Sequence, residues 1–177
     1  METIELLGRP DLDALRCLLG RPLLQMFTRS IDLYRHVAVA RNFSIPLEGG
    51  KFCVIESDWN DTVENAIDYH ILEVRVCDTP KGFSLVTGRD GALLLGSPSS
   101  INLLTGSRVT KIEVLEHRDE FKGEKVHFDL AIVFSTADRY RFALSAQQSI
   151  AGGLEFFDQE SLVGELLERH SVRVTLD

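Results

Sequence analysis

Two residues that could take part in acid–base or metal chemistry, His127 and Asp129, stand two positions apart in a run of alternating residues. In a β-strand such side chains project from the same face, so the imidazole and the carboxylate would lie together. The pair could begin a metal site or serve in an enzyme, but the sequence offers no obvious further ligand. A solvated polar strand face explains the pair more simply, and His70 is interpreted as a half-buried structural histidine.

The short motifs that mark catalytic and cofactor sites are missing from the chain. There is no G-x-S-x-G elbow, Walker loop, G-x-G-x-x-G turn or H-E-x-x-H motif. The cysteines Cys17, Cys53 and Cys77 are too widely spaced for a zinc site, and we interpret them as reduced core residues. The sequence therefore predicts no metal and no cofactor, and an enzyme only if distant residues assemble its site.

Acidic residues gather in two stretches, residues 52–74 and 143–168, that contain no lysine or arginine. The first surrounds the single tryptophan, Trp59. An exposed aromatic ring among carboxylates suits a basic protein partner, because the charges steer association and the ring supplies binding energy. Solvated loop and helix positions would explain the same carboxylates, and Trp59 would also fit a core. The candidate partner-binding residues are Glu56, Asp58, Trp59, Asp61, Glu64, Asp158 and Glu160.

The charge balance narrows the class of partner. The 177-residue chain has 27 acidic and 19 basic residues, a formal net charge of −8. Nucleic acid and anionic membranes are disfavoured as partners, because both are bound through surplus lysine and arginine. No secretory signal or membrane span is predicted, since the apolar runs are short and no early basic cluster occurs. The composition predicts a single cytoplasmic domain, residues 1–177, and leaves the oligomeric state open.

The elements that would carry these residues are mainly strands. An antiparallel hairpin, residues 126–134 and 140–144, is indicated by strict alternation around a tight polar turn. Alternation of this kind predicts that one face packs on the core and the other faces water. Further strands are predicted at residues 52–56, 69–77, 83–86, 92–95, 108–116, 149–157 and 172–176.

Helices are predicted near both ends. The first follows an N-cap at Asp11 and stops at Gly20, and the second follows a cap at Asp158 and ends near His170. Residues 22–40 fit either a helix or strands. We therefore expect an α+β fold, mainly antiparallel sheet, with a last strand after the second helix. An open sheet and a partly closed barrel are both compatible with the pattern.

The closing part of the chain resembles a known group of proteins. It runs FDLAIVF (128–134), a tight turn, YRFAL (140–144), SIAGGLEF (149–156) and the acid-capped DQESLVGELLERH (158–170). This order is similar to the C-terminal part of β-rich immunity proteins of bacterial toxin–immunity systems. The resemblance lies in element order and turn residues, so no binding residues carry over. It implies a cytosolic inhibitor that blocks a cognate toxin by surface complementarity.

Three functions are compatible with these observations. The first is a non-catalytic protein-binding module, an immunity protein that inhibits a toxin through an acidic surface. The second is a barrel-like protein that holds a small apolar ligand, because alternating strands line cavities as well as cores. The third is an enzyme whose site is not visible in the sequence.

Overall fold

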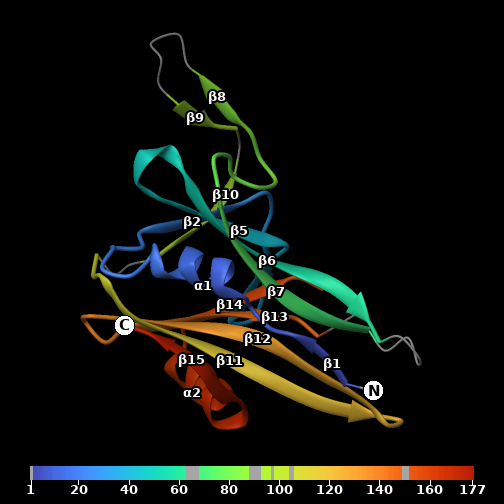
Figure 1. Ribbon diagram of the computed structural model, residues 1–177. Helices are drawn as coiled ribbons and strands as arrows, with labels where there is room; N and C mark the ends of the chain where they lie inside the picture. The colour runs from blue at the N-terminus through green and yellow to red at the C-terminus, as the bar shows by residue number, and fades with distance from the viewer. Residues whose placement is uncertain (1, 63–67, 88–92, 97, 104–105, 149–151) are drawn as a thin grey trace.

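Two packed β-sheets and two helices form the described part of the chain, residues 2–62, 68–87, 93–96, 98–103, 106–148 and 152–177, in a computed structural model (Figure 1). The larger sheet has the order β15-β11-β12-β13-β14-β4-β3, and β1 pairs in parallel with β12. Its strands are β1 (Glu2–Glu5), β3 (Asp32–Tyr34), β4 (Val37–Ala40), β11 (Val109–Phe121), β12 (Glu124–Thr136), β13 (Arg141–Ala146), β14 (Leu154–Phe157) and β15 (Ser171–Leu176).

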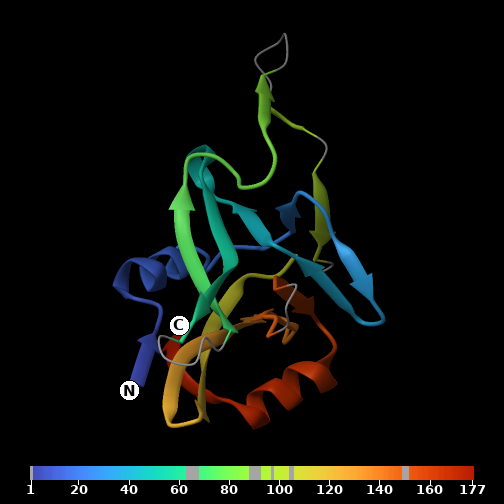
Figure 2. The same cartoon turned by 90° about the vertical axis from the view of Figure 1, so that its right-hand side faces the viewer.

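The second sheet has the order β10-β2-β5-β6-β7, with antiparallel pairing throughout. A separate two-stranded pair, β8 with β9, projects from the top of the molecule (Figure 2). The bounds of these strands are β2 (Gln25–Thr28), β5 (Asn42–Pro46), β6 (Phe52–Asp61), β7 (Asp68–Cys77), β8 (Leu85–Thr87), β9 (Leu93–Leu95) and β10 (Ser99–Asn102), and a 3-10 turn, η1 (Glu48–Gly50), precedes β6.

The expected α+β class, mainly antiparallel, is confirmed. Neither of the two larger sheets closes on itself through any pairing among the described residues, so these residues form no closed barrel. No helix in the described ranges is long and apolar enough to cross a membrane. The predicted strand at residues 149–157 begins only at Leu154, and residues 149–151 lie outside the described part.

The hairpin predicted from alternation is confirmed as β12 and β13, with Phe134 opposite Phe142. The expectation that one of its faces meets water is wrong. Phe134 packs between the two sheets, whereas Val133 packs on the opposite face beneath helix α2 (Glu160–Arg169). Both faces are apolar because α2 lies across the outer face of the larger sheet, as Figure 1 shows.

Neither helix has the N-cap residue that was predicted for it. Helix α1 (Arg9–Arg16) begins earlier than expected, because Pro10 has no N–H and fits only in a first turn. Asp11 is therefore not the N-cap; its carboxylate accepts a 2.8 Å hydrogen bond from the Gly8 N–H. At α2 the N-cap position belongs to Gln159. Asp158 instead accepts a 2.8 Å hydrogen bond from the Tyr140 hydroxyl.

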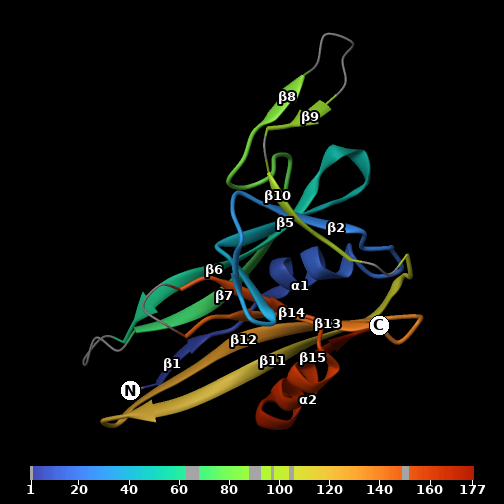
Figure 3. The same ribbon diagram turned by 180° about the vertical axis from the view of Figure 1, so that it is seen from behind.

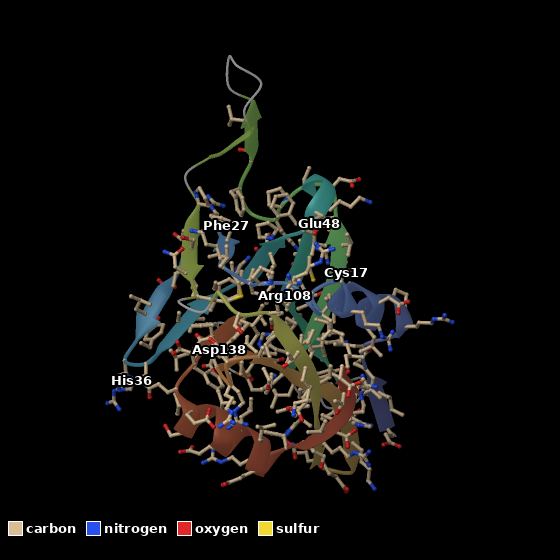
Figure 4. All side chains as sticks on the ribbon, turned by 90° about the vertical axis from the view of Figure 1, so that its left-hand side faces the viewer. Cys17, Phe27, His36, Glu48, Arg108 and Asp138 are labelled. Carbon is tan, nitrogen blue, oxygen red and sulfur yellow. The ribbon has the colours of Figure 1, made fainter. Side chains whose placement is uncertain are left out.

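Residues 22–40, which fitted two descriptions, are strands β2, β3 and β4. Two of them have partners distant in sequence, since β2 pairs with β10 and β4 pairs with β14, whereas β3 pairs with its neighbour β4. The β3–β4 hairpin projects from the body, with His36 labelled at its tip in Figure 4. Long-range pairing therefore decided a segment that local pattern left open.

The cysteines occupy three different environments. Cys53 is buried in the core between the sheets, Cys77 is partly buried, and Cys17 is exposed beside α1 (Figure 4). The prediction of core residues is therefore confirmed for Cys53 and wrong for Cys17. The pKa of the Cys53 thiol is raised to about 12. Burial is the largest cause, and the nearby Cys17 and Cys77 are smaller causes. Because only the thiolate is nucleophilic, Cys53 is chemically inert in the folded protein.

We expect a thiol reagent such as Ellman's reagent to modify Cys17 quickly in the native protein and Cys53 only after denaturation. Absorbance during the reaction measures both phases. The variant C17S should lose the fast phase and keep the Cys53 reaction in denaturant. Modification of Cys53 at the rate of Cys17 in the folded protein would contradict the burial of this thiol.

Candidate functional site

The end of the β6–β7 hairpin carries an exposed tryptophan. Five consecutive residues of β6, Phe52–Glu56, are buried, but the strand then runs beyond the core. Trp59 lies in this protruding part, and 55% of its surface is exposed. His70 stands opposite Trp59 and Asp68 stands opposite Asp61 across the β6–β7 pair. The strand pairing therefore holds the backbone at Trp59 in place, and the large indole is partly exposed to solvent.

Several carboxylates lie on the strands near this tryptophan. Asp58 precedes it, and its side chain accepts a 2.9 Å hydrogen bond from the backbone N–H of Trp59. The Asn60 amide donates to Glu5 at 3.4 Å, which brings β1 beside the hairpin. We call Glu5, Asp58, Trp59, Asp61 and Asp68 the acidic hairpin end. None of its four carboxylates forms an ion pair with a lysine or arginine in the described part of the chain.

Two buried polar atoms at this end lack a hydrogen-bond partner among the described residues, the Tyr69 hydroxyl and one carboxylate oxygen of Asp61. The pKa of Tyr69 is raised, first by burial and then by the negative charges of Glu5 and Asp61. The tyrosine thus stays neutral beside carboxylates whose charge is not balanced locally. A lysine or arginine of another protein would stabilise these carboxylates by donating hydrogen bonds to them.

Glu56, also predicted for this surface, does not belong to it. Its side chain is buried, and it forms ion pairs with Arg75 of β7 and with Lys81. Arg75 and Lys81 neutralise the charge of Glu56 internally. Glu64 lies outside the described residues, so the structure says nothing of it.

The two acidic residues predicted near the second helix also have internal partners. Asp158 binds the Tyr140 hydroxyl, and Glu160 forms an ion pair with Arg141, whose Nε donates to it at 3.1 Å. No interaction within the described ranges joins either residue to the acidic hairpin end. The predicted set is therefore divided, and only Asp58, Trp59 and Asp61 lie together on the hairpin.

His127 and Asp129 are both buried, so the interpretation as a solvated face is wrong. The His127 Nε2 lies 2.7 Å from Glu116. Asp129 accepts a 2.7 Å hydrogen bond from the Leu7 N–H and forms an ion pair with Arg173. A register shift in the β11–β15 pairing leaves Arg173 without an opposite residue, which turns its long side chain toward Asp129.

The chemistry that His127 and Asp129 suggested does not assemble around them. They bind different partners, and no group of three potential metal ligands occurs in the described part. His70 is buried as well. The Gln148 side chain accepts a 2.9 Å hydrogen bond from the His70 backbone N–H and donates a 2.7 Å hydrogen bond to the His70 carbonyl oxygen. Glu116 and Arg173 were missed by sequence reasoning because they lie on neighbouring strands and carry no local motif.

Comparison with known proteins yields no match to any family model, curated protein or solved structure.

Proposed function

We propose that this chain is a non-catalytic protein-binding module whose acidic hairpin end docks on a basic partner. The observation that carries the proposal is the exposed Trp59, flanked by carboxylates with no internal cation partner among the described residues. The partner class follows from the resemblance of the closing part of the chain to immunity proteins. The partner is then the cognate toxin of a bacterial toxin–immunity pair, inhibited in the cytoplasm by this protein.

In the acidic hairpin end, the tryptophan and the carboxylates would contribute to binding in different ways. The indole of Trp59 has a large apolar area to bury, and tryptophan is among the residues that most often dominate binding energy. The carboxylates would attract a basic surface over a distance of about 10 Å at moderate salt, which accelerates association. Strands β6 and β7 are hydrogen-bonded to each other on both sides of Trp59, so little backbone entropy is lost there on binding.

The other functions considered have less support. An apolar ligand was expected inside a barrel, and the strand order in the described residues is open. The enzyme considered from the sequence would use His127 and Asp129, but His127 is hydrogen-bonded to Glu116 and Asp129 is ion-paired with Arg173. Neither alternative has an observation in its favour that matches the exposed tryptophan.

The proposal is tested by co-purification with the product of any toxin-like gene that lies beside the gene for this chain, followed by calorimetry. We expect W59A to weaken binding by about 30-fold or more, as for a tryptophan hot spot. D58K/D61K should weaken it further, mainly through slower association that no longer depends on salt. Circular dichroism and thermal unfolding check that both variants keep the native fold, which matters most for D61K because one carboxylate oxygen of Asp61 is buried.

The matched control is E48K/D78K, which makes the same change in charge at exposed residues near the opposite end of β6. This variant should bind like the original protein. If D58K/D61K and E48K/D78K both leave the affinity unchanged, the acidic hairpin end is not the interface. If the neighbouring protein does not bind at all, the toxin–immunity assignment fails.

A further inference from the structure

A cleft of about 430 Å³ lies beside the β3–β4 hairpin. Its walls come from β3, β4 and the residues that directly follow β2, β4 and β13. Figure 3 shows the hairpin beside β14, with which β4 pairs. Among the lining residues are Arg29, Asp32, Tyr34, Val39 and Arg41. Pockets that hold small molecules have volumes of roughly 300–1,000 Å³, so a cleft of this size can admit one large side chain.

Two arginines of this cleft have no counter-ion within the described part of the chain. Neither Arg29 nor Arg41 belongs to any ion pair there, and the same is true of Asp32, the acidic residue of the lining. Glu155 of the adjacent β14 is hydrogen-bonded to Gln147 and is not part of the lining. The lining therefore has two unpaired guanidinium groups against one carboxylate.

Apolar side chains are exposed at the same edge of the larger sheet. Leu33 and Tyr34 are 79% and 62% exposed, and they lie on β3, the last strand of this sheet. Tyr34 lines the cleft together with Val39, so the two arginines share the cleft with apolar surface. An aromatic ring with carboxylates beside it would suit this combination. The ring would pack on the apolar wall, and the guanidinium groups would bind the carboxylates and stack on the ring.

The acidic hairpin end of the same chain has these features. Trp59 is the single tryptophan and is 55% exposed. Asp58 and Asp61 beside it have no cation partner among the described residues. Trp59 does not line the cleft of its own chain. Every copy of the chain therefore carries a cleft and, on another surface, a side chain and charges that complement it.

We propose that the cleft beside β3 binds the acidic hairpin end of a second copy of this chain. Trp59 of the second copy packs against Tyr34 and Val39. The carboxylates beside it bind Arg29 and Arg41, because guanidinium and carboxylate groups form charge-assisted, often bidentate, hydrogen bonds. An interface centred on one side chain is small, so the association is weak and reversible.

Self-association would use the same surface that is proposed to dock on the basic partner. A tightly bound partner therefore displaces the second copy. Each copy has a net charge of −8, so a general repulsion opposes the contact at low salt. At about 0.15 M salt the Debye length is about 8 Å, which screens this repulsion while ion pairs in contact persist. Association is therefore measured at this salt concentration.

The single tryptophan allows the contact to be tested with this protein alone. The variant R29Q/R41Q keeps Trp59 and lacks the arginines of the cleft, whereas W59A has an intact cleft and no tryptophan. In sedimentation velocity, the original protein should associate as its concentration rises, and each variant by itself should remain monomeric. When W59A is titrated into R29Q/R41Q, the tryptophan emission should shift to shorter wavelength and saturate, because the only indole enters an apolar cleft.

Two further titrants provide the controls. W59A/R29Q/R41Q lacks both guanidinium groups of the cleft and should bind at least about tenfold more weakly than W59A. W59A/R9Q/R139Q removes two exposed arginines outside the cleft and should act like W59A. Circular dichroism of each variant checks that it is folded.

The proposal is overturned if W59A leaves the emission unchanged, or if W59A/R29Q/R41Q shifts it at the same concentration as W59A. Equal weakening by W59A/R9Q/R139Q would also overturn it, because the effect would then come from net charge. An original protein that stays monomeric at every concentration would do the same. The basic partner takes no part in these measurements. Their failure therefore leaves the docking of the acidic hairpin end on that partner standing, and failure of that docking leaves the emission result unchanged.

Discussion

Replacing Asp129 with alanine should lower the free energy of unfolding by about 3–5 kcal/mol, because it leaves the partially buried Arg173 without its counter-ion. Asp129 is 1% exposed, and the side chain of Arg173 is 20% exposed. The same carboxylate accepts the Leu7 N–H at 2.7 Å, so the substitution also removes the partner of a buried backbone donor. Urea denaturation followed by circular dichroism measures the loss.

The control for this prediction is D78A, which removes an exposed aspartate and should change stability by no more than about 0.5 kcal/mol. A double variant, D129L/R173M, should recover much of the loss, because apolar residues of similar size can replace a buried ion pair. If D129A is as stable as D78A, the buried charge network does not support the fold in the way we describe.

The variant F142A should be destabilised by about 3–5 kcal/mol through the cavity that it creates. Phe142 is fully buried between the two sheets. Its ring stacks on Phe134 with centroids 4.7 Å apart, and it also meets Phe156 at 5.8 Å. These two rings come from β12 and β14, the strands on either side of β13, and have little freedom to fill the space. Thermal and urea unfolding both measure the loss.

L33A serves as the comparison for F142A, since Leu33 is 79% exposed on the edge strand β3. We expect L33A to unfold within about 0.5 kcal/mol of the original protein. A loss for F142A no larger than that for L33A would show that the aromatic stack is not part of a tightly packed core.

The β12–β13 hairpin could be predicted because its information is local. Alternating residues and a tight turn are read from the sequence without knowledge of any other segment. The burial of its second face could not be predicted in this way. That face is covered by α2, which follows β14 and packs Val163 against the sheet. Whether this face is covered depends on where α2 packs, and no residue pattern within the hairpin predicts that position.

In the candidate site, too, some features could be predicted from local sequence and others depend on residues distant in the chain. The absence of lysine and arginine from residues 52–74 indicated an acidic region around Trp59 and left open whether the ring is exposed or buried. In the structure Asp58 and Trp59 are exposed. Glu56 differs because Arg75 and Lys81 reach it from elsewhere in the chain. Glu5 and Asp68 joined the acidic hairpin end only through the arrangement of β1 and β7 around the hairpin.

The sequence by itself determined the mainly antiparallel α+β class, the acidic balance and the acidic neighbourhood of Trp59. These properties follow from composition and from periods of a few residues, which act locally. Only the tertiary structure decided which charges remain unpaired. Asp129 is neutralised by Arg173, 44 residues away, whereas Asp58 and Asp61 have no cation partner among the described residues. An ion pair depends on distance in space, and in a sheet that distance is set by strand order rather than by position in the chain.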